Sequence, residues 1–186
     1  MKSVLISINP KCCELIASGK KTIEVRKTAP KEVPFKAYIY ETYDKKYVDI
    51  GICLGNGKCF EHGCKKVIGE FICDEVERFN VGSLRSDDIE KLACLSYNEM
   101  INYFYKPEQL DGKTVKQGFA LHISDLKIYD KPKELSEFYR PCSYSGICYS
   151  CNRFRPNGTP NDEPNDFCDG EITRPPQSWQ YVEELK

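Results

Sequence analysis

Apolar and polar residues alternate over residues 2–8, near the start of the chain. A period of two is typical of a β-strand with one buried face. The apolar side chains of that face are Val4, Ile6 and Ile8. Asn9 is a favoured N-cap residue and Pro10 suits the first helical position, so we predict that a short helix begins there and ends at Gly19.

A second alternating segment follows this predicted helix. Ile23 and Val25 form its apolar face, and because side chains alternate along a strand, the other face carries Glu24 and Arg26. Further strands are predicted at residues 36–42, 66–73, 117–123 and 127–129. The intervening stretch 43–65 shows little helix or strand pattern.

The middle of the chain contains two helix start signals. Ser86 is a suitable cap for a short helix that runs to Leu95. Ser96 and Glu99 are three residues apart, which is the spacing of a capping box, and they predict a second helix over residues 97–105.

Several short strands with only short helices between them predict an α+β fold with a mixed β-barrel core and short peripheral helices. The composition changes near residue 132, after which Cys, Pro, Asn and Asp become frequent. We therefore expect one domain over residues 1–131 and a cysteine-rich extension over residues 132–186 that packs on the same domain. Near the end of the extension, two prolines precede Trp179, Tyr181 and Val182, which are expected to add an edge strand with Trp179 as a buried anchor.

Composition and charge narrow the classes of function. The chain has 186 residues, 40% of them hydrophobic, and a net charge of −1, which excludes the whole-chain signature of a strongly basic nucleic-acid-binding protein. Any anion site must therefore be local, and residues 11–36 do carry seven basic and only three acidic side chains. No apolar run approaches the ~20 residues that span a bilayer, and the N-terminal segment is too short for a signal peptide, so we expect a cytoplasmic protein without a membrane partner.

Eleven cysteines are many for a protein of a reducing compartment, where thiols and metal sites are expected in place of disulfides. Four of them fall within 27 residues and include a C-x2-C pair: Cys142, Cys148, Cys151 and Cys168. Four thiolates suit a tetrahedral metal and leave no open position for water, so we predict structural zinc, or iron in the same geometry, with ordinary buried thiols as the alternative. A second candidate metal site consists of Cys53, Cys59, His62 and Cys64. The alternative is a glycine-rich loop in which these thiols have no common function.

The segment SGKKTIEVRK, residues 18–27, carries the candidate chemistry. The guanidinium of Arg26 offers a planar fork of donors to a phosphate or a base edge, and the carboxylate of Glu24 can accept from an amino group such as cytosine N4. The ammonium groups of Lys20 and Lys21 add positive charge but, unlike the planar guanidinium, do not fix the orientation of a ligand. A ligand-binding cleft made by these four residues is one interpretation, and a solvated strand edge on which Glu24 and Arg26 pair with each other is the other.

Three segments together resemble the ASCH domain family of PUA-like β-barrels: LISINP at residues 5–10, SGKKTIEVR at residues 18–26 and VIGEF at residues 67–71. The resemblance covers about residues 1–130. It implies a pseudobarrel with a cleft lined by the second segment, in which RNA or a nucleotide binds.

The same resemblance implies an alternative activity, because some bacterial relatives are amidohydrolases that act on N4-acetylcytidine. In these relatives a motif lysine, a threonine three residues later and a distant glutamate are catalytic. Lys21 matches the lysine, Glu24 stands where the threonine would be, and three acids could supply the distant carboxylate: Glu70, Asp74 and Glu99. Catalysis under this alternative would use Lys21 and Glu24.

The sequence thus leaves three hypotheses. The first is an RNA- or nucleotide-binding domain with a zinc-stapled extension, and the second is an amidohydrolase of N4-acylated cytidine. The third is a metal-stabilised protein-interaction module, which would explain the extension but not the charged strand.

Overall fold

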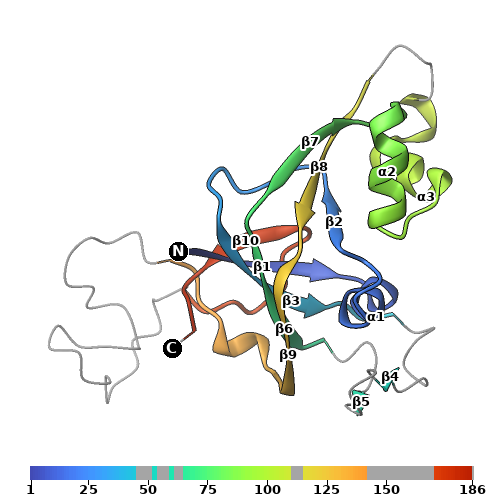
Figure 1. Ribbon diagram of the computed structural model, residues 1–186. Helices are drawn as coiled ribbons and strands as arrows, with labels where there is room; N and C mark the ends of the chain where they lie inside the picture. The colour runs from blue at the N-terminus through green and yellow to red at the C-terminus, as the bar shows by residue number, and fades with distance from the viewer. Residues whose placement is uncertain (45–51, 54–58, 61–64, 110–114, 142–169, 186) are drawn as a thin grey trace, which may run out of the picture.

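The structure is a computed structural model that describes residues 1–44, 52–53, 59–60, 65–109, 115–141 and 170–185. Its main body contains a five-stranded sheet, a three-stranded sheet and three α-helices (Figure 1). Two further 3-10 turns lie at Pro107–Gln109 and Leu135–Glu137, and a two-stranded ladder joins β4 (Ile52–Cys53) to β5 (Cys59–Phe60).

The five-stranded sheet has the order β10-β1-β3-β6-β9. Its strands are β10 (Trp179–Val182), β1 (Lys2–Ile8), β3 (Phe35–Glu41), β6 (Val67–Cys73) and β9 (Ser124–Lys133). β1 runs parallel to β3, and every other pair is antiparallel, so the sheet is mixed. The final strand therefore lies beside the first, as the apolar residues after the double proline predict.

The three-stranded sheet has the order β2-β8-β7 and is antiparallel throughout. Its strands are β2 (Ile23–Arg26), β8 (Gln117–His122) and β7 (Val76–Asn80). Helices α2 (Leu84–Leu92) and α3 (Tyr97–Phe104) lie beside this sheet, whereas α1 (Pro10–Ala17) lies at the end of β1 (Figure 1).

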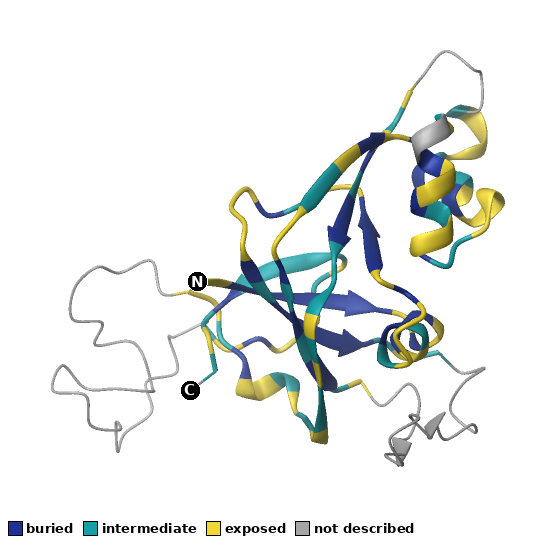
Figure 2. Ribbon diagram, viewed as in Figure 1, coloured by how far each residue is buried: buried dark blue, intermediate teal, exposed yellow. Residues whose placement is uncertain are grey.

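The two faces of the three-stranded sheet contact different cores. Ile23 and Val25 belong to a buried cluster with Phe79 and Ala120 of the neighbouring strands and with apolar residues of α2 and α3. The opposite face contributes Leu121 to the hydrophobic cluster that packs against the five-stranded sheet. Burial is greatest along β1, β2 and β3, and the outer faces of the helices are exposed (Figure 2).

The α+β class is confirmed, and the predicted strands at 2–8, 23–26, 36–42, 66–73 and 117–123 are all present. The described strands form separate ladders, and closure into a barrel stays a prediction. None of the described helices has the length and apolar composition needed to cross a membrane.

Three local predictions were wrong. β7 was not predicted, because the segment VERFN has charges at two of its five positions. Helix α2 begins before Ser86, with Ser83 at the N-cap, and buried Ser86 lies inside the first turn with its hydroxyl 3.2 Å from Glu90 Oε1. Two short strands, β4 and β5, lie in the stretch expected to have little regular structure.

Candidate functional site

Strand β2 presents Glu24 and Arg26 towards the space between the two sheets. The side chains of Ile23 and Val25 are taken up by the cluster under α2 and α3, so alternation directs the two charged residues the other way. Both charged residues are buried, with 6% and 7% of their surfaces exposed. A solvated strand edge, one interpretation of the sequence, is therefore not what the structure contains.

Lys21 is the most deeply buried charged residue of the site, at 2% exposure. Its ammonium group donates to the carbonyl of Ala93, 2.8 Å away, and Ala93 is the C-cap residue of α2. A cation at this place complements the partial negative charge of a helix C-terminus and satisfies one of its free carbonyls. The Lys21 side chain thus connects the segment just before β2 to the C-terminal end of α2.

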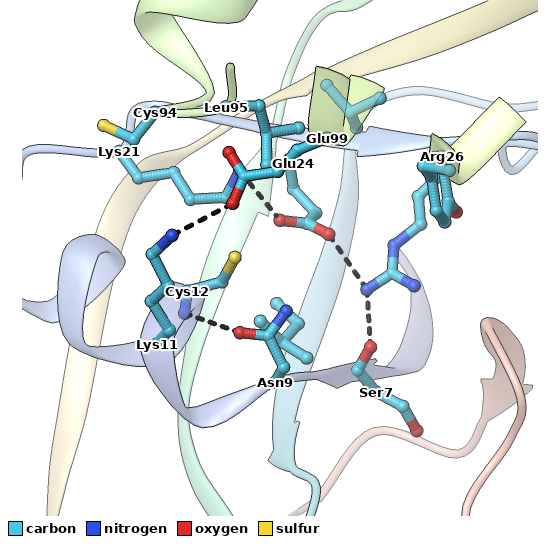
Figure 3. A pocket seen from close by; sticks show the side chains of 13 residues that line it. Ser7, Asn9, Lys11, Cys12, Lys21, Glu24, Arg26, Cys94, Leu95 and Glu99 are labelled. Carbon is cyan, nitrogen blue, oxygen red and sulfur yellow. Dashed lines mark hydrogen bonds and ion pairs between the residues drawn. The ribbon is translucent and has the colours of Figure 1, made fainter. Parts of the chain in front are cut away.

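Glu24 lies between two cations (Figure 3). The Nζ atom of Lys21 is 3.3 Å from Glu24 Oε2, and the Nη2 atom of Arg26 is 3.0 Å from Glu24 Oε1. The same Nη2 donates to the carbonyl of Ser7 on β1 at 2.5 Å. The row of charges therefore ties the two sheets and the end of α2 together.

Two atoms of this row are buried without a hydrogen bond among the described residues: Glu24 Oε2 and Arg26 Nε. The Lys21 ammonium lies near Glu24 Oε2 but does not have hydrogen-bond geometry to it. An unsatisfied buried polar atom costs about 1–3 kcal/mol, and more when it is charged. One acceptor atom of Glu24 and one donor atom of Arg26 are thus left without a hydrogen bond.

Lys21, Glu24 and Arg26 line a pocket of about 270 Å³ between β1, α1, β2, the turn after α2 and helix α3. Residues from the turn after α2 and from α3 form one wall, among them Cys94, Leu95 and Tyr103. Ser7, Asn9 and Cys12 belong to the opposite wall. The side chains of Lys21 and Arg26 approach the Glu24 carboxylate from its two sides (Figure 3).

An exposed ion pair connects the two walls of this pocket. Lys11 of α1 and Glu99 of α3 both line it, and their charged groups are 3.0 Å apart. Glu99 also accepts from the backbone N–H and the hydroxyl of Ser96, completing the predicted capping box. The Ser96 donors, chiefly the backbone N–H, and the Lys11 ammonium lower the pKa of Glu99 to about 2.

Two other ionisable groups of the pocket stay neutral at ordinary pH. Burial raises the pKa of the Cys12 thiol, and the nearby Lys21 ammonium opposes that shift only in part. Burial also raises the pKa of Tyr103, against the effect of Arg26. The pocket therefore offers a thiol and a phenol hydroxyl beside its charged row.

The structure brings together three of the four residues predicted to bind a ligand, namely Lys21, Glu24 and Arg26. The fourth, Lys20, is exposed and does not line the pocket. Of the three acids considered for a distant catalytic carboxylate, Glu99 lines the pocket. The carboxylate of Glu70 instead accepts from the Tyr129 hydroxyl at 2.5 Å, and Asp74 is exposed in the turn between β6 and β7.

Most of the residues that form the walls of this pocket were not predicted from the sequence. Asn9 caps α1 by accepting from the Cys12 N–H, so its position was predictable although its place at the pocket was not. Leu95 and Tyr103 reach the site only because α2 and α3 pack on the sheet, and nothing local in the sequence indicates this.

The predicted zinc ligands Cys142, Cys148, Cys151 and Cys168 lie outside the described residues, as do His62 and Cys64 and the side chains of Cys53 and Cys59. Within the described part of the chain, no group of three or more His, Cys, Asp or Glu residues could hold a metal ion. Zinc stays a prediction from the sequence.

Comparison with solved structures finds the ASCH protein from Zymomonas mobilis, with a TM-score of 0.56 and 19% identity over 98% of this chain and 89% of that one. Two mutants of that protein match similarly, with TM-scores of 0.53 and 0.55 at 18% and 19% identity, over 99% and 98% of this chain and 92% and 89% of theirs. No protein-family model and no curated protein matches the chain. The chain has the ASCH fold, as the resemblance implied.

Proposed function

We propose that this chain binds RNA or a nucleotide-type ligand, and that the pocket around Glu24 receives the base. One observation carries the proposal: Glu24 Oε2 and Arg26 Nε are buried without a hydrogen bond among the described residues, and both side chains line the pocket. A ligand that completes both needs a donor and an acceptor, and a base with an exocyclic amino group presents both kinds of group.

The charge of the pocket supports a base over a phosphate as its occupant. Glu24 offsets one of the two cations Lys21 and Arg26, and the ion pair of Lys11 with Glu99 is neutral. The remaining excess is a single positive charge, and a carboxylate stands at the centre of the site. A phosphate pressed against Glu24 would be repelled, whereas an amino group would be attracted.

The contacts of Lys21 support binding over the amidohydrolase alternative. Its nitrogen donates to the Ala93 carbonyl and faces the Glu24 carboxylate, which are the surroundings of a structural ammonium group. A lysine that acts as a base or nucleophile needs a free lone pair, and desolvation beside other cations is the usual way to provide it. Here a carboxylate takes the place of such a cation.

The test is a binding titration of cytidine, guanosine and short RNA with the wild type and Glu24→Gln, which keeps the shape of the side chain and removes its charge. We expect Glu24→Gln to weaken binding about tenfold or more, because a hydrogen bond to a charged group contributes about 1.5–3 kcal/mol. Lys20→Gln is the matched control, since it removes an exposed charge of the same segment outside the pocket.

If the wild type and Glu24→Gln bind equally well, and thermal unfolding shows that both proteins are folded, the proposal is contradicted. Release of acetate from N4-acetylcytidine that is lost in Lys21→Met would favour the amidohydrolase instead.

A further inference from the structure

A row of three side chains crosses the three-stranded sheet from the pocket to its far edge. Arg26 of β2 is directly opposite Phe119 of β8, and Phe119 is directly opposite Arg78 of β7. Opposed residues of antiparallel strands project to the same face. The row therefore lies on the sheet face opposite to that of Ile23 and Val25, and β2, β8 and β7 can be followed across it in Figure 1.

The far end of this row borders a second cavity of about 400 Å³. The loop after β2 forms one side of it with Pro30 and Lys31, and the sheet forms the other with Val76, Arg78 and Phe119. Among the residues that the structure describes, no acidic one lines this cavity. Its chemistry is two cations and an aromatic ring on an apolar background, which differs from the mixed charges of the first pocket.

Both cations of the second cavity are available to a ligand. In the part of the chain that the structure describes, neither Lys31 nor Arg78 forms an ion pair, and both are exposed. The guanidinium of Arg78 lies 5.3 Å from the centre of the Phe119 ring. Glu77, which precedes Arg78 in β7, projects to the other face because side chains alternate along a strand.

An aromatic ring beside unpaired cations is the combination that single-stranded nucleic acids use, since a base stacks on the ring and the backbone phosphate meets the cations. Arg26 and Arg78 are two strand spacings apart, which is about 10 Å. Arg26 lines the first pocket and Arg78 the second, so the two cavities lie at opposite ends of this row.

We infer that the cavity at Lys31, Arg78 and Phe119 holds the phosphate and base of the adjoining nucleotide of a single-stranded nucleic acid. This inference rests on the proposed function and adds to it that the ligand is an oligonucleotide, not a free nucleotide. The phosphate contacts excluded from the first pocket by Glu24 are supplied here.

The experiment compares a labelled single-stranded RNA hexamer with the corresponding nucleoside, for the wild type, Arg78→Glu and the control Lys106→Glu. Lys106 is an exposed lysine that does not line the second cavity, and its substitution changes the net charge equally. We expect Arg78→Glu to weaken hexamer binding about tenfold or more and to reduce the slope of log affinity against log salt by about one, because one phosphate contact is lost. Nucleoside binding should not change, since the first pocket is intact.

A second variant, Phe119→Leu, tests the stacking. Loss of one base–aromatic contact corresponds to about 1–3 kcal/mol, or roughly five- to 150-fold in hexamer affinity, with the nucleoside again unaffected. Thermal unfolding of each variant shows whether the protein is folded.

Three results would overturn the inference. If Arg78→Glu and Lys106→Glu weaken hexamer binding equally, the second site is wrong while the proposed function stands. If neither hexamer nor nucleoside binds the wild type, the proposed function fails and the inference with it. If a poly-glutamate peptide competes as well as RNA of equal charge, the occupant is not a nucleic acid.

Discussion

At the scale of the residue, Glu24 decides the character of the site. A carboxylate buried between two cations costs desolvation energy, and removing one partner of such a buried set typically costs 3–5 kcal/mol, because the other charges are left without compensation. Glu24 Oε2 lies near the Lys21 ammonium but has no hydrogen bond among the described residues, so the fold does not satisfy this carboxylate completely. A ligand amino group would complete it, which is why Glu24 is the residue chosen to test the proposed function.

Glu99 gives a pH dependence of stability whose sign follows from its pKa. Because this pKa is lowered from 4.5 to about 2 in the folded protein, the carboxylate stabilises the fold fully above pH about 4.5, and this contribution is lost as the pH falls towards 2. We expect the urea midpoint of the wild type to fall across this window, with the fall reduced in Glu99→Gln. The Lys11 pair is exposed and contributes at most ~1 kcal/mol of the effect.

Glu108→Gln is the control for this measurement, since Glu108 is an exposed carboxylate in the turn that follows α3. If the wild type and Glu99→Gln have the same urea midpoints at every pH between 5 and 2, the pH-dependent loss of stability does not come from the Glu99 carboxylate.

At the scale of the element, the packing of α3 on the three-stranded sheet builds one wall of the pocket. Gly118 of β8 lies against two aromatic rings: a Cβ atom there would lie 2.6 Å from Phe79 Cζ and 2.7 Å from Phe104 Cζ. The absence of a side chain at this position lets the two rings meet edge to face, with their centres 6.1 Å apart. The position of α3, and therefore of Tyr103, depends on this contact.

Gly118→Ala is expected to lower the unfolding free energy by about 1–3 kcal/mol, because both rings must move away from the added methyl group. Chemical denaturation measures this change. Gln117→Ala, at the exposed neighbouring position, should stay within about 0.5 kcal/mol of the wild type. Equal stability of the two variants would show that the rings move at no cost.

At the scale of the whole molecule, the end of the chain returns to its beginning. β10 pairs with β1, and the indole N–H of half-buried Trp179 donates to the Thr28 carbonyl at 3.0 Å, just beyond the charged end of β2. The segment before β10 contains the four cysteines predicted to bind zinc. Metal binding there would contribute to the folding free energy of this segment, since folding and metal binding are coupled in segments without a core of their own.

Elemental analysis of the purified protein tests the zinc prediction. We expect about one zinc or iron ion per chain, lost when Cys148 and Cys151 are both changed to serine, because the C-x2-C pair supplies two of the four ligands. Changing the buried Cys13 and Cys73 to serine is the control, as these thiols lie in the core of the five-stranded sheet. Metal-free wild-type protein prepared without chelators would refute the prediction.

Most of the strands, α1 with its Asn9 cap, the capping box at Ser96 and the strand face that carries Glu24 and Arg26 were predictable from the sequence, because periodicity and caps are local properties. Three features were not predictable in this way: Lys20 lies outside the pocket, Glu99 and not Glu70 lines it, and Arg78 lies in register with Arg26. The physical reason is that burial, ion pairing and strand register depend on segments far apart in the chain, whose approach is set by packing such as that of α3 against Gly118.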